Sequence, residues 1–339
     1  MPLASLGSDI SSFGDAVSKF FSNLAHVHFG ALALGLIVYA LHLTLGARAY
    51  FNGVRAAYPA ERIPFRRVWG AYIAAFGFNG VVPAKGGGVI KLFLVKTSVR
   101  NSTYSTVAST FLVEAFFNFA IAVPILIFAF TQGVFPKPPD FSKLHAFDLS
   151  FFAGHFRFTL FLLTALAVLA LLAFALLSSR VKAFWARVRQ GLTIYFDRER
   201  YLREVFALQL VAWCLKFTAY WFLLDAFRVG GSFRNVMLVM GVNAVASVVP
   251  LTPGGAGVQQ ALLVQVFAGA ASGATIAAYS VGQQIAIAAF SLALGFIALV
   301  TIFRFRSFKD VIAAGRADRE RERERAAAIA DPGAPRAPA

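Results

Sequence analysis

The sequence is poor in charged residues and in cysteine. Asp, Glu, Lys and Arg make up 14% of the 339 residues, whereas 58% are hydrophobic and the mean hydropathy is +0.68. A soluble domain needs far more polar surface, so the chain is predicted to be an integral membrane protein. The single cysteine, Cys214, lies within an apolar run. A lone cysteine excludes an internal disulfide, and we expect it to be a small buried hydrophobic residue.

Acidic residues are scarcer than basic ones, 16 against 32, which gives a net charge of +16. The basic residues flank apolar segments instead of forming a patch on a soluble domain. This pattern is typical of loops that stay on the cytoplasmic side of a membrane and contact anionic headgroups. Membrane lipids, anionic or polyprenyl, are therefore the expected partners, and nucleic acid is not. A lipid-modifying enzyme is a further possible partner.

Signals of catalysis are also lacking. The five histidines have no metal-ligand spacing, and no nucleophile elbow, Walker loop or dinucleotide fingerprint occurs. We therefore predict no metal, no cofactor and no enzyme activity.

Residues 1–28 lack the basic start and short apolar core of a cleaved signal peptide. Their apolar residues recur at helical spacing, which predicts an amphipathic helix along the membrane surface.

Long apolar runs predict an all-α, polytopic membrane protein. They occupy residues 29–47, 104–130, 156–178, 205–227 and 275–303, and each is close to the roughly 20 residues that cross a bilayer. Two further regions, 68–97 and 235–272, each hold two shorter apolar arms around a Pro/Gly turn. A helical arm of about 14 residues rises only about 21 Å, less than a core of about 30 Å. The first region is thus predicted to be a re-entrant hairpin; in the second, with longer arms, two full crossings are the alternative.

The two broken regions resemble each other in sequence. Each begins with Val-Val-Pro and continues into a glycine cluster and a new apolar segment, with a gap of two residues between the copies. In a bilayer, backbone broken in this way survives only where protein or a wet cavity satisfies it. Paired broken segments commonly lie at the binding site of a transporter. The turn residues are therefore candidates for the substrate path: Pro83, Gly86, Gly88, Pro250, Pro253, Gly254, Gly255 and Gly257.

Basic residues set the predicted orientation. They follow the spans at 29–47, 156–178 and 275–303, whereas loop 131–155 balances lysine with aspartate. The N-terminus is therefore expected outside and the C-terminus in the cytoplasm. Repeat A (about 29–130) and repeat B (about 205–303) are then inverted around a linking span at 156–178, an architecture typical of alternating access. A Pro/Gly turn used twice by coincidence is the alternative. Residues 304–339 form a charged tail, expected to be a solvated helix fraying into disorder, without a site.

Glu114 is the strongest single candidate for a functional residue. It lies deep in an apolar run, where a charge costs at least about 2.5 kcal/mol on insertion scales. Asn118 follows one helical turn later on the same face. We expect both to point inward, to the first broken hairpin or to a cavity. In the alternative interpretation, Glu114 lies near the interface or is protonated and caps loose backbone.

Other intramembrane polar residues surround the two turns. Neutral amides there satisfy freed backbone or bind a headgroup, and they comprise Asn79, Asn243, Gln259 and Gln260. Lys85 and Lys91 near the first turn would favour a phosphate beside a half-helix N-terminus, or would snorkel to the interface. Gln283 and Gln284 could pack between helices. Lys216 could snorkel or pair with a neighbouring span.

At these motifs the chain resembles the lysylphosphatidylglycerol synthase transmembrane-region family, also called flippase-like integral membrane proteins, which includes the flippase half of the multiple peptide resistance factor. The resemblance covers most of residues 29–303 and rests on three segments, 79–91, 114–118 and 250–260. Family members usually carry Arg-Glu where this chain has Gln259-Gln260, and Glu-Arg-x-x-Asp where it has Glu114 to Asn118. The aminoacyl-transferase domain of the synthases is absent from the sequence, so the resemblance does not imply lipid aminoacylation.

Three hypotheses for function follow. The first is a lipid translocase that moves a phospholipid, an aminoacylated lipid or a polyprenol-linked sugar across the bacterial cytoplasmic membrane. The second is a non-transporting membrane partner that presents lipid to a glycosyltransferase or another transferase. The third, with the weakest basis, is an intramembrane transferase that uses Glu114 as a base. We favour the first, because broken hairpins from opposite faces would line a groove for a polar headgroup.

Overall fold

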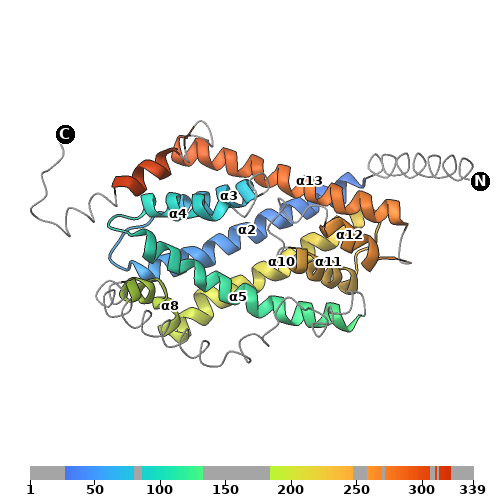
Figure 1. Cartoon of the computed structure of the whole chain (residues 1–339), viewed down its shortest axis with the longest axis horizontal. Coiled ribbons are helices and arrows are strands. Elements are labelled where there is room, and N and C mark those ends of the chain that lie inside the picture. Colours follow the sequence, from blue (N-terminus) through green and yellow to red (C-terminus); the bar gives the residue numbers. More distant parts are fainter. Residues whose placement is uncertain are drawn as a thin grey trace, which may run out of the picture.

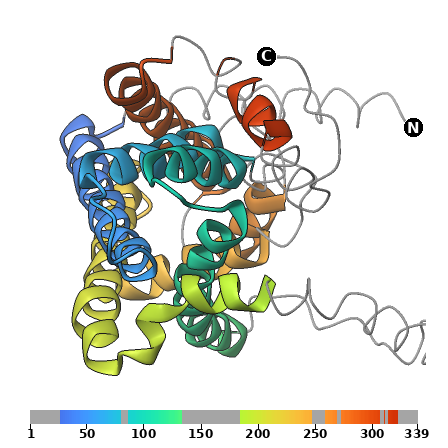
Figure 2. The ribbon, with the colours of Figure 1, turned by 90° about the vertical axis from the view of Figure 1, so that its left-hand side faces the viewer.

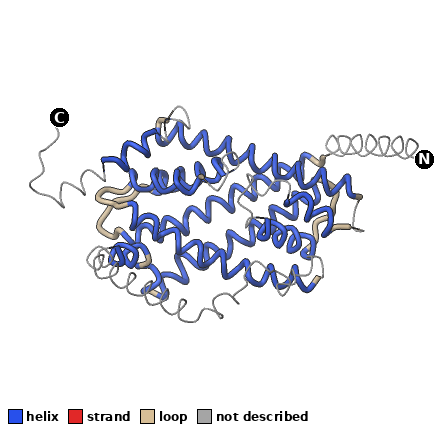
Figure 3. The backbone as a smooth tube through the Cα atoms, viewed as in Figure 1, coloured by secondary structure: helices blue, strands red, loops and turns tan. Residues whose placement is uncertain are grey.

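The computed structural model describes residues 27–79, 86–132, 184–246, 258–268, 272–305, 310 and 313–321. These residues form helices joined by turns, and no β-strand occurs among them (Figure 3). The all-α prediction is therefore confirmed. The predicted interfacial helix at 1–28 and the linking span at 156–178 lie almost wholly outside the described residues.

Within the described residues, four helical rods are long and apolar enough to cross a membrane. They run through Phe29–Ala57, Tyr104–Thr131, Arg198–Ala226 and Gly273–Phe303, with 29, 28, 29 and 31 residues. At about 1.5 Å per residue each exceeds a hydrocarbon core of about 30 Å. Their main elements are α2 (Phe29–Ala57), α5 (Tyr104–Thr131), α10 (Ala207–Ala226) and α13 (Gly273–Ala298), and π-helical turns η4 (Leu202–Phe206) and η6 (Leu299–Phe303) extend the last two. These rods confirm four of the five predicted spans.

The first rod continues to Ala57, beyond the predicted boundary at residue 47. Arg48 does not interrupt it, because its guanidinium lies 5.2 Å from the ring centroids of both Phe51 and Phe65. The helix ends where Pro59 follows the C-cap Tyr58, since the residue before a proline disfavours the α conformation.

Four shorter helices form two pairs. The first pair is α3 (Phe65–Asn79) and α4 (Gly87–Ser98), and the second is α11 (Phe233–Ala246) and α12 (Val258–Val266). Members of each pair pack against each other. With 15, 12, 14 and 9 residues, each rises about 13–23 Å, less than a bilayer core. The two pairs occupy opposite ends of the bundle (Figure 1).

Two of the long helices, α5 and α13, begin at a hydroxyl side chain. Thr103 caps the N-terminus of α5 by accepting a hydrogen bond from the backbone N–H of Thr106, and Ser272 caps α13 in the same way with Thr275. Both are hydroxyl side chains three residues before the N–H that they satisfy, which is the usual N-cap geometry.

The bundle is held by three main helix pairings (Figure 2): α2 packs on α10, α3 on α13, and α5 on α11. Glycines allow the closest approach. A Cβ at Gly77 of α3 would lie 2.6 Å from the carbonyl oxygen of Ser291 of α13, and one at Gly295 would lie 3.2 Å from the Cα of Ala74. Small residues at helix contacts are typical of membrane bundles, where packing replaces the hydrophobic effect as the driving force.

Hydrogen bonds define the two ends of the bundle. At one end His28 N–H donates to the Ala226 carbonyl, and Arg234 Nε donates to Gln132 Oε1. At the other end Gln190 Nε2 donates to the Ala57 carbonyl, close to the short helices 184–191, α8 (Thr193–Phe196) and α9 (Arg198–Tyr201).

The described part of the tail, residues 313–321, is helical and docks at this second end. Asp318 accepts hydrogen bonds from Lys96 Nζ of α4 and from the hydroxyl of Tyr104 of α5. Arg319 lies over the Tyr104 ring, 5.3 Å from its centroid.

Candidate functional site

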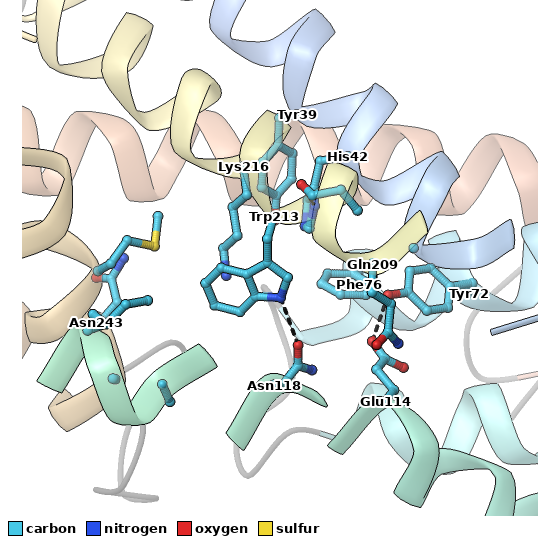
Figure 4. Close-up of a pocket in the computed structure, with 16 residues that line it drawn as sticks. Tyr39, His42, Tyr72, Phe76, Glu114, Asn118, Gln209, Trp213, Lys216 and Asn243 are labelled. Atoms are coloured by element: carbon cyan, nitrogen blue, oxygen red, sulfur yellow. Dashed lines mark hydrogen bonds between the residues drawn. The ribbon is translucent and has the colours of Figure 1, made fainter. Parts of the chain in front are cut away.

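Two adjoining cavities lie inside the bundle. They measure about 370 Å³ and 280 Å³ and share Tyr39, Phe76, Lys216 and Asn243 in their walls. The first is bounded by α2, α3, α5, α10 and α11 (Figure 4), and α12 and α13 contribute to the second. The volume of the first cavity is typical of pockets that hold small ligands. Elements from both halves of the sequence therefore enclose one polar interior.

Glu114 of α5 lies in the wall of the first cavity and is fully engaged. Its Oε1 accepts a hydrogen bond from the Tyr72 hydroxyl at 2.7 Å, and its Oε2 pairs with Lys91 Nζ at 3.0 Å. The prediction that Glu114 faces the first broken hairpin is confirmed, because Tyr72 belongs to α3 and Lys91 to α4.

Lys91 is 9% exposed and lies against aromatic rings. Its Nζ is 4.4 Å from the ring centroid of Tyr50 and 4.1 Å from that of Phe111. The sequence suggested a phosphate ligand or a snorkelling side chain, whereas the structure buries Lys91 as the counter-ion of Glu114. Ring faces and a carboxylate together replace the hydration that the ammonium loses.

Asn118, predicted to share the inward face of Glu114, also lines the first cavity. Its Oδ1 accepts a hydrogen bond from Trp213 Nε1 at 3.0 Å, which joins α5 to α10. Lys216 Nζ lies 4.4 Å from the Trp213 ring centroid. Figure 4 places Lys216 beside this indole, between Trp213 and Asn243. Trp213 and Lys216 were not among the predicted site residues.

Three further polar side chains complete this wall. His42 Nδ1 donates to the Ala212 carbonyl at 2.8 Å, because a carbonyl oxygen can only accept. Gln209 is buried. Neither Gln209 Oε1 nor Asn243 Oδ1 accepts a hydrogen bond from the described residues. Both residues line the cavity, and a buried acceptor without a partner in the described structure calls for a donor from elsewhere.

The second cavity is lined by the amides predicted near the turns. Asn79 and Gln259 lie in its wall with Gln283 and Gln284. Asn79 Oδ1 also accepts a hydrogen bond from the Gly87 N–H at 3.0 Å. This bond confirms the expectation that such an amide satisfies freed backbone, here at the start of α4.

A second polar pair ties α12 to α13. Gln260 Nε2 donates to Gln284 Oε1 at 2.7 Å. Lys91 and Gln260 each follow a glycine cluster in the sequence, and each contacts the next long helix. One hairpin is thus fastened by a charged pair and the other by a neutral one.

The glycine required by packing in the first turn is Gly87. A Cβ there would collide with the carbonyl oxygen of Ala75, whereas one at Gly88 would meet nothing within 4 Å. Gly86 is the N-cap of α4 in an ordinary α conformation. The remaining candidates lie outside the described residues: Pro83, Lys85, Pro250, Pro253, Gly254, Gly255 and Gly257.

Cys214 is exposed on α10, so the prediction of a buried cysteine is wrong. It lines a surface groove with Phe217, Trp221 and Phe233. The apolar run around it does not mark the interior, because an outer face in lipid is as hydrophobic as a protein core. Among the described residues no cluster of His, Cys, Asp and Glu could hold a metal ion.

Long apolar rods around a polar interior define a polytopic helical membrane protein. The family model of the lysylphosphatidylglycerol synthase TM region matches residues 13–295, so the chain belongs to this family and the suspected resemblance is confirmed. No curated protein and no solved structure matches the chain.

Proposed function

We propose that this protein is a lipid translocase that moves a lipid with a polar headgroup across the cytoplasmic membrane, without covalent chemistry. The observation that carries the proposal is the polar interior enclosed by otherwise apolar helices. A headgroup crossing a bilayer needs such an interior, because a charge in hydrocarbon is costly. The acyl or prenyl tails would remain in the surrounding lipid.

The pairing of helices supports inverted repeats. In such repeats α2 would match α10, α3 would match α11 and α5 would match α13. The contact of α3 with α13 then has its counterpart in the contact of α11 with α5. The contact of α2 with α10 joins two matching helices directly. The Lys91–Glu114 and Gln260–Gln284 pairs join the matching helices, α4 to α5 and α12 to α13. Two hairpins at opposite ends, each fastened to the next long helix, are elements that could open in turn.

The distribution of charge supports the orientation with the C-terminus in the cytoplasm. Basic side chains gather at the end of the bundle where Ala57 and Gln190 meet, and they include Arg55, Arg62, Arg66, Arg67, Arg189, Arg198, Arg200 and Arg203. At the opposite end the loops carry Arg228 and Arg234. Under the positive-inside rule the first end faces the cytoplasm, and the pair α3–α4 then enters from that side.

Reconstitution into liposomes tests the proposal. Purified protein is inserted with fluorescent phosphatidylglycerol, an aminoacylated lipid or a polyprenyl-phosphate sugar in both leaflets, and a membrane-impermeant quencher is added outside. We expect quenching to proceed past the outer-leaflet fraction for at least one class. No movement of any class above protein-free liposomes would refute the translocase.

A further inference from the structure

Lys216 is a cation placed well inside a membrane-spanning rod, Arg198–Ala226. It lies near the centre of α10, about 15 Å along the axis from either end of that helix. The four-carbon stem of a lysine cannot cover this distance, so snorkelling does not account for its position. Its Nζ instead lies beside Trp213 at the junction of the two cavities.

The charge of Lys216 has no carboxylate partner among the described residues. Only Glu114 and Lys216 carry a full charge among the described residues that line the two cavities. Both oxygens of Glu114 are occupied, one by Tyr72 and the other by Lys91. The charges of Glu114 and Lys91 therefore cancel, and the positive charge of Lys216 remains in the interior. A half-buried cation of this kind attracts an anion more strongly than a cation in open water does, because less water screens it.

We propose that Lys216 binds the phosphate of a headgroup that also carries hydroxyl groups, an inference that rests on and sharpens the proposed function. The ammonium would donate to the phosphate oxygens in a charge-assisted hydrogen bond. Gln209 and Asn243 line the same cavity, and Gln209 Oε1 and Asn243 Oδ1 accept no hydrogen bond from the described residues. A rotation of either side chain would turn its amide oxygen toward a hydroxyl group of the headgroup. Trp213, fixed by its bond to Asn118, holds the ammonium from the other side. The substrate class is thus a hydroxylated phosphodiester or phosphomonoester lipid.

Equilibrium binding tests the site directly. Purified protein is titrated with dihexanoyl-phosphatidylglycerol, with free glycerol 1-phosphate and with uncharged dihexanoylglycerol. We expect Lys216→Met to weaken phosphatidylglycerol binding by about 10- to 100-fold, as for the loss of one hydrogen bond to a charged group. Lys216→Arg should retain binding. Glycerol phosphate that binds through Lys216 would assign the site to a soluble phosphate as well, whereas binding of the lipid alone would assign it to a headgroup.

A matched control removes a cation of the same rod outside the cavity. The side chain of Arg203 is 73% exposed and pairs with Glu199 on the surface, so Arg203→Met should bind as the wild type does. Should Lys216→Met fail to fold, Lys216→Gln takes its place. Binding of phosphatidylglycerol by the folded Lys216 variant at wild-type affinity would overturn the proposal.

The liposome assay separates this inference from the translocase. If phosphatidylglycerol binds through Lys216 but no lipid moves, the translocase is refuted and the phosphate site at Lys216 stands. Lipid movement and binding that are both unchanged in Lys216→Met would refute the site and leave the translocase.

Discussion

Replacing Glu114 with glutamine breaks the buried pair that fastens α4 to α5. Glutamine keeps the size of the side chain and its hydrogen bond with Tyr72, but it removes the charge opposite Lys91. Lys91 would then remain 9% exposed, with aromatic rings as its main compensation. The first hairpin would lose its ion pair with α5 but keep the hydrogen bond from Tyr72.

The magnitude follows from the burial of both partners. Removing one member of a buried ion pair typically costs about 3–5 kcal/mol, and rings near the ammonium offset part of it, each by about 0.5–2 kcal/mol. We expect Glu114→Gln to lower the free energy of unfolding by about 3 kcal/mol. The double variant Lys91→Gln with Glu114→Gln should lose about 1.5 kcal/mol or less, because it recreates a neutral amide pair like Gln260–Gln284 and leaves no buried charge.

The assay is unfolding by dodecyl sulfate in mixed micelles, followed by circular dichroism, with lipid movement measured on the same preparations. Glu114→Gln is expected to insert into the membrane normally and to move no lipid. A single variant with wild-type stability, or a double variant as unstable as the sum of the two single variants, would refute the buried pair. Wild-type transport by Glu114→Gln would remove Glu114 from the mechanism.

Two further predictions concern the hairpin turn and the tail. Gly87→Ala should destabilise the protein by about 1–3 kcal/mol through overpacking against Ala75, whereas Gly88→Ala, with open space around it, should melt as the wild type does. Burial raises the pKa of Asp318, but hydrogen bonds from Lys96 and Tyr104 outweigh it and hold this pKa below 3.8. Docking of 313–321 should therefore be constant from pH 7 to pH 5 and weaken only as the pH falls below 3.8. Amide hydrogen exchange of 313–321, corrected for its intrinsic rate, measures this; a loss of protection near pH 6 would contradict it.

The four rods were predictable because length and hydropathy alone decide whether a helix crosses a membrane. The inward face of Glu114 and Asn118 was also predictable, because a polar pair one turn apart in an apolar helix has to avoid lipid. The C-terminal end of α2 was not predictable. Arg48, inside the helix, packs on Phe51 and Phe65, and only the tertiary structure reveals these neighbours.

The partners of the site were hidden from the sequence for a physical reason. Lys91 and Glu114 are 23 residues apart in different helices, so their contact depends on how α4 packs on α5. For Lys216 the sequence left snorkelling and pairing with a neighbouring span open. Its contact with Trp213, three residues earlier on α10, follows from helical spacing, but its place at both cavities depends on how the helices pack. Gly87, rather than Gly86 or Gly88, is critical because the register of α3 against α4 sets which Cβ would collide.

The most direct test of the central claim is access to the cavity from the two sides of the membrane. Asn243→Cys, in a Cys214→Ala background, places a thiol where the two cavities meet. A membrane-impermeant thiol reagent is applied to right-side-out and to inside-out vesicles, and dihexanoyl-phosphatidylglycerol is added as a competitor. The translocase predicts labelling from both faces and protection by the lipid. Labelling from one face alone would fit a protein that presents lipid to an enzyme, and it would contradict a route across the membrane.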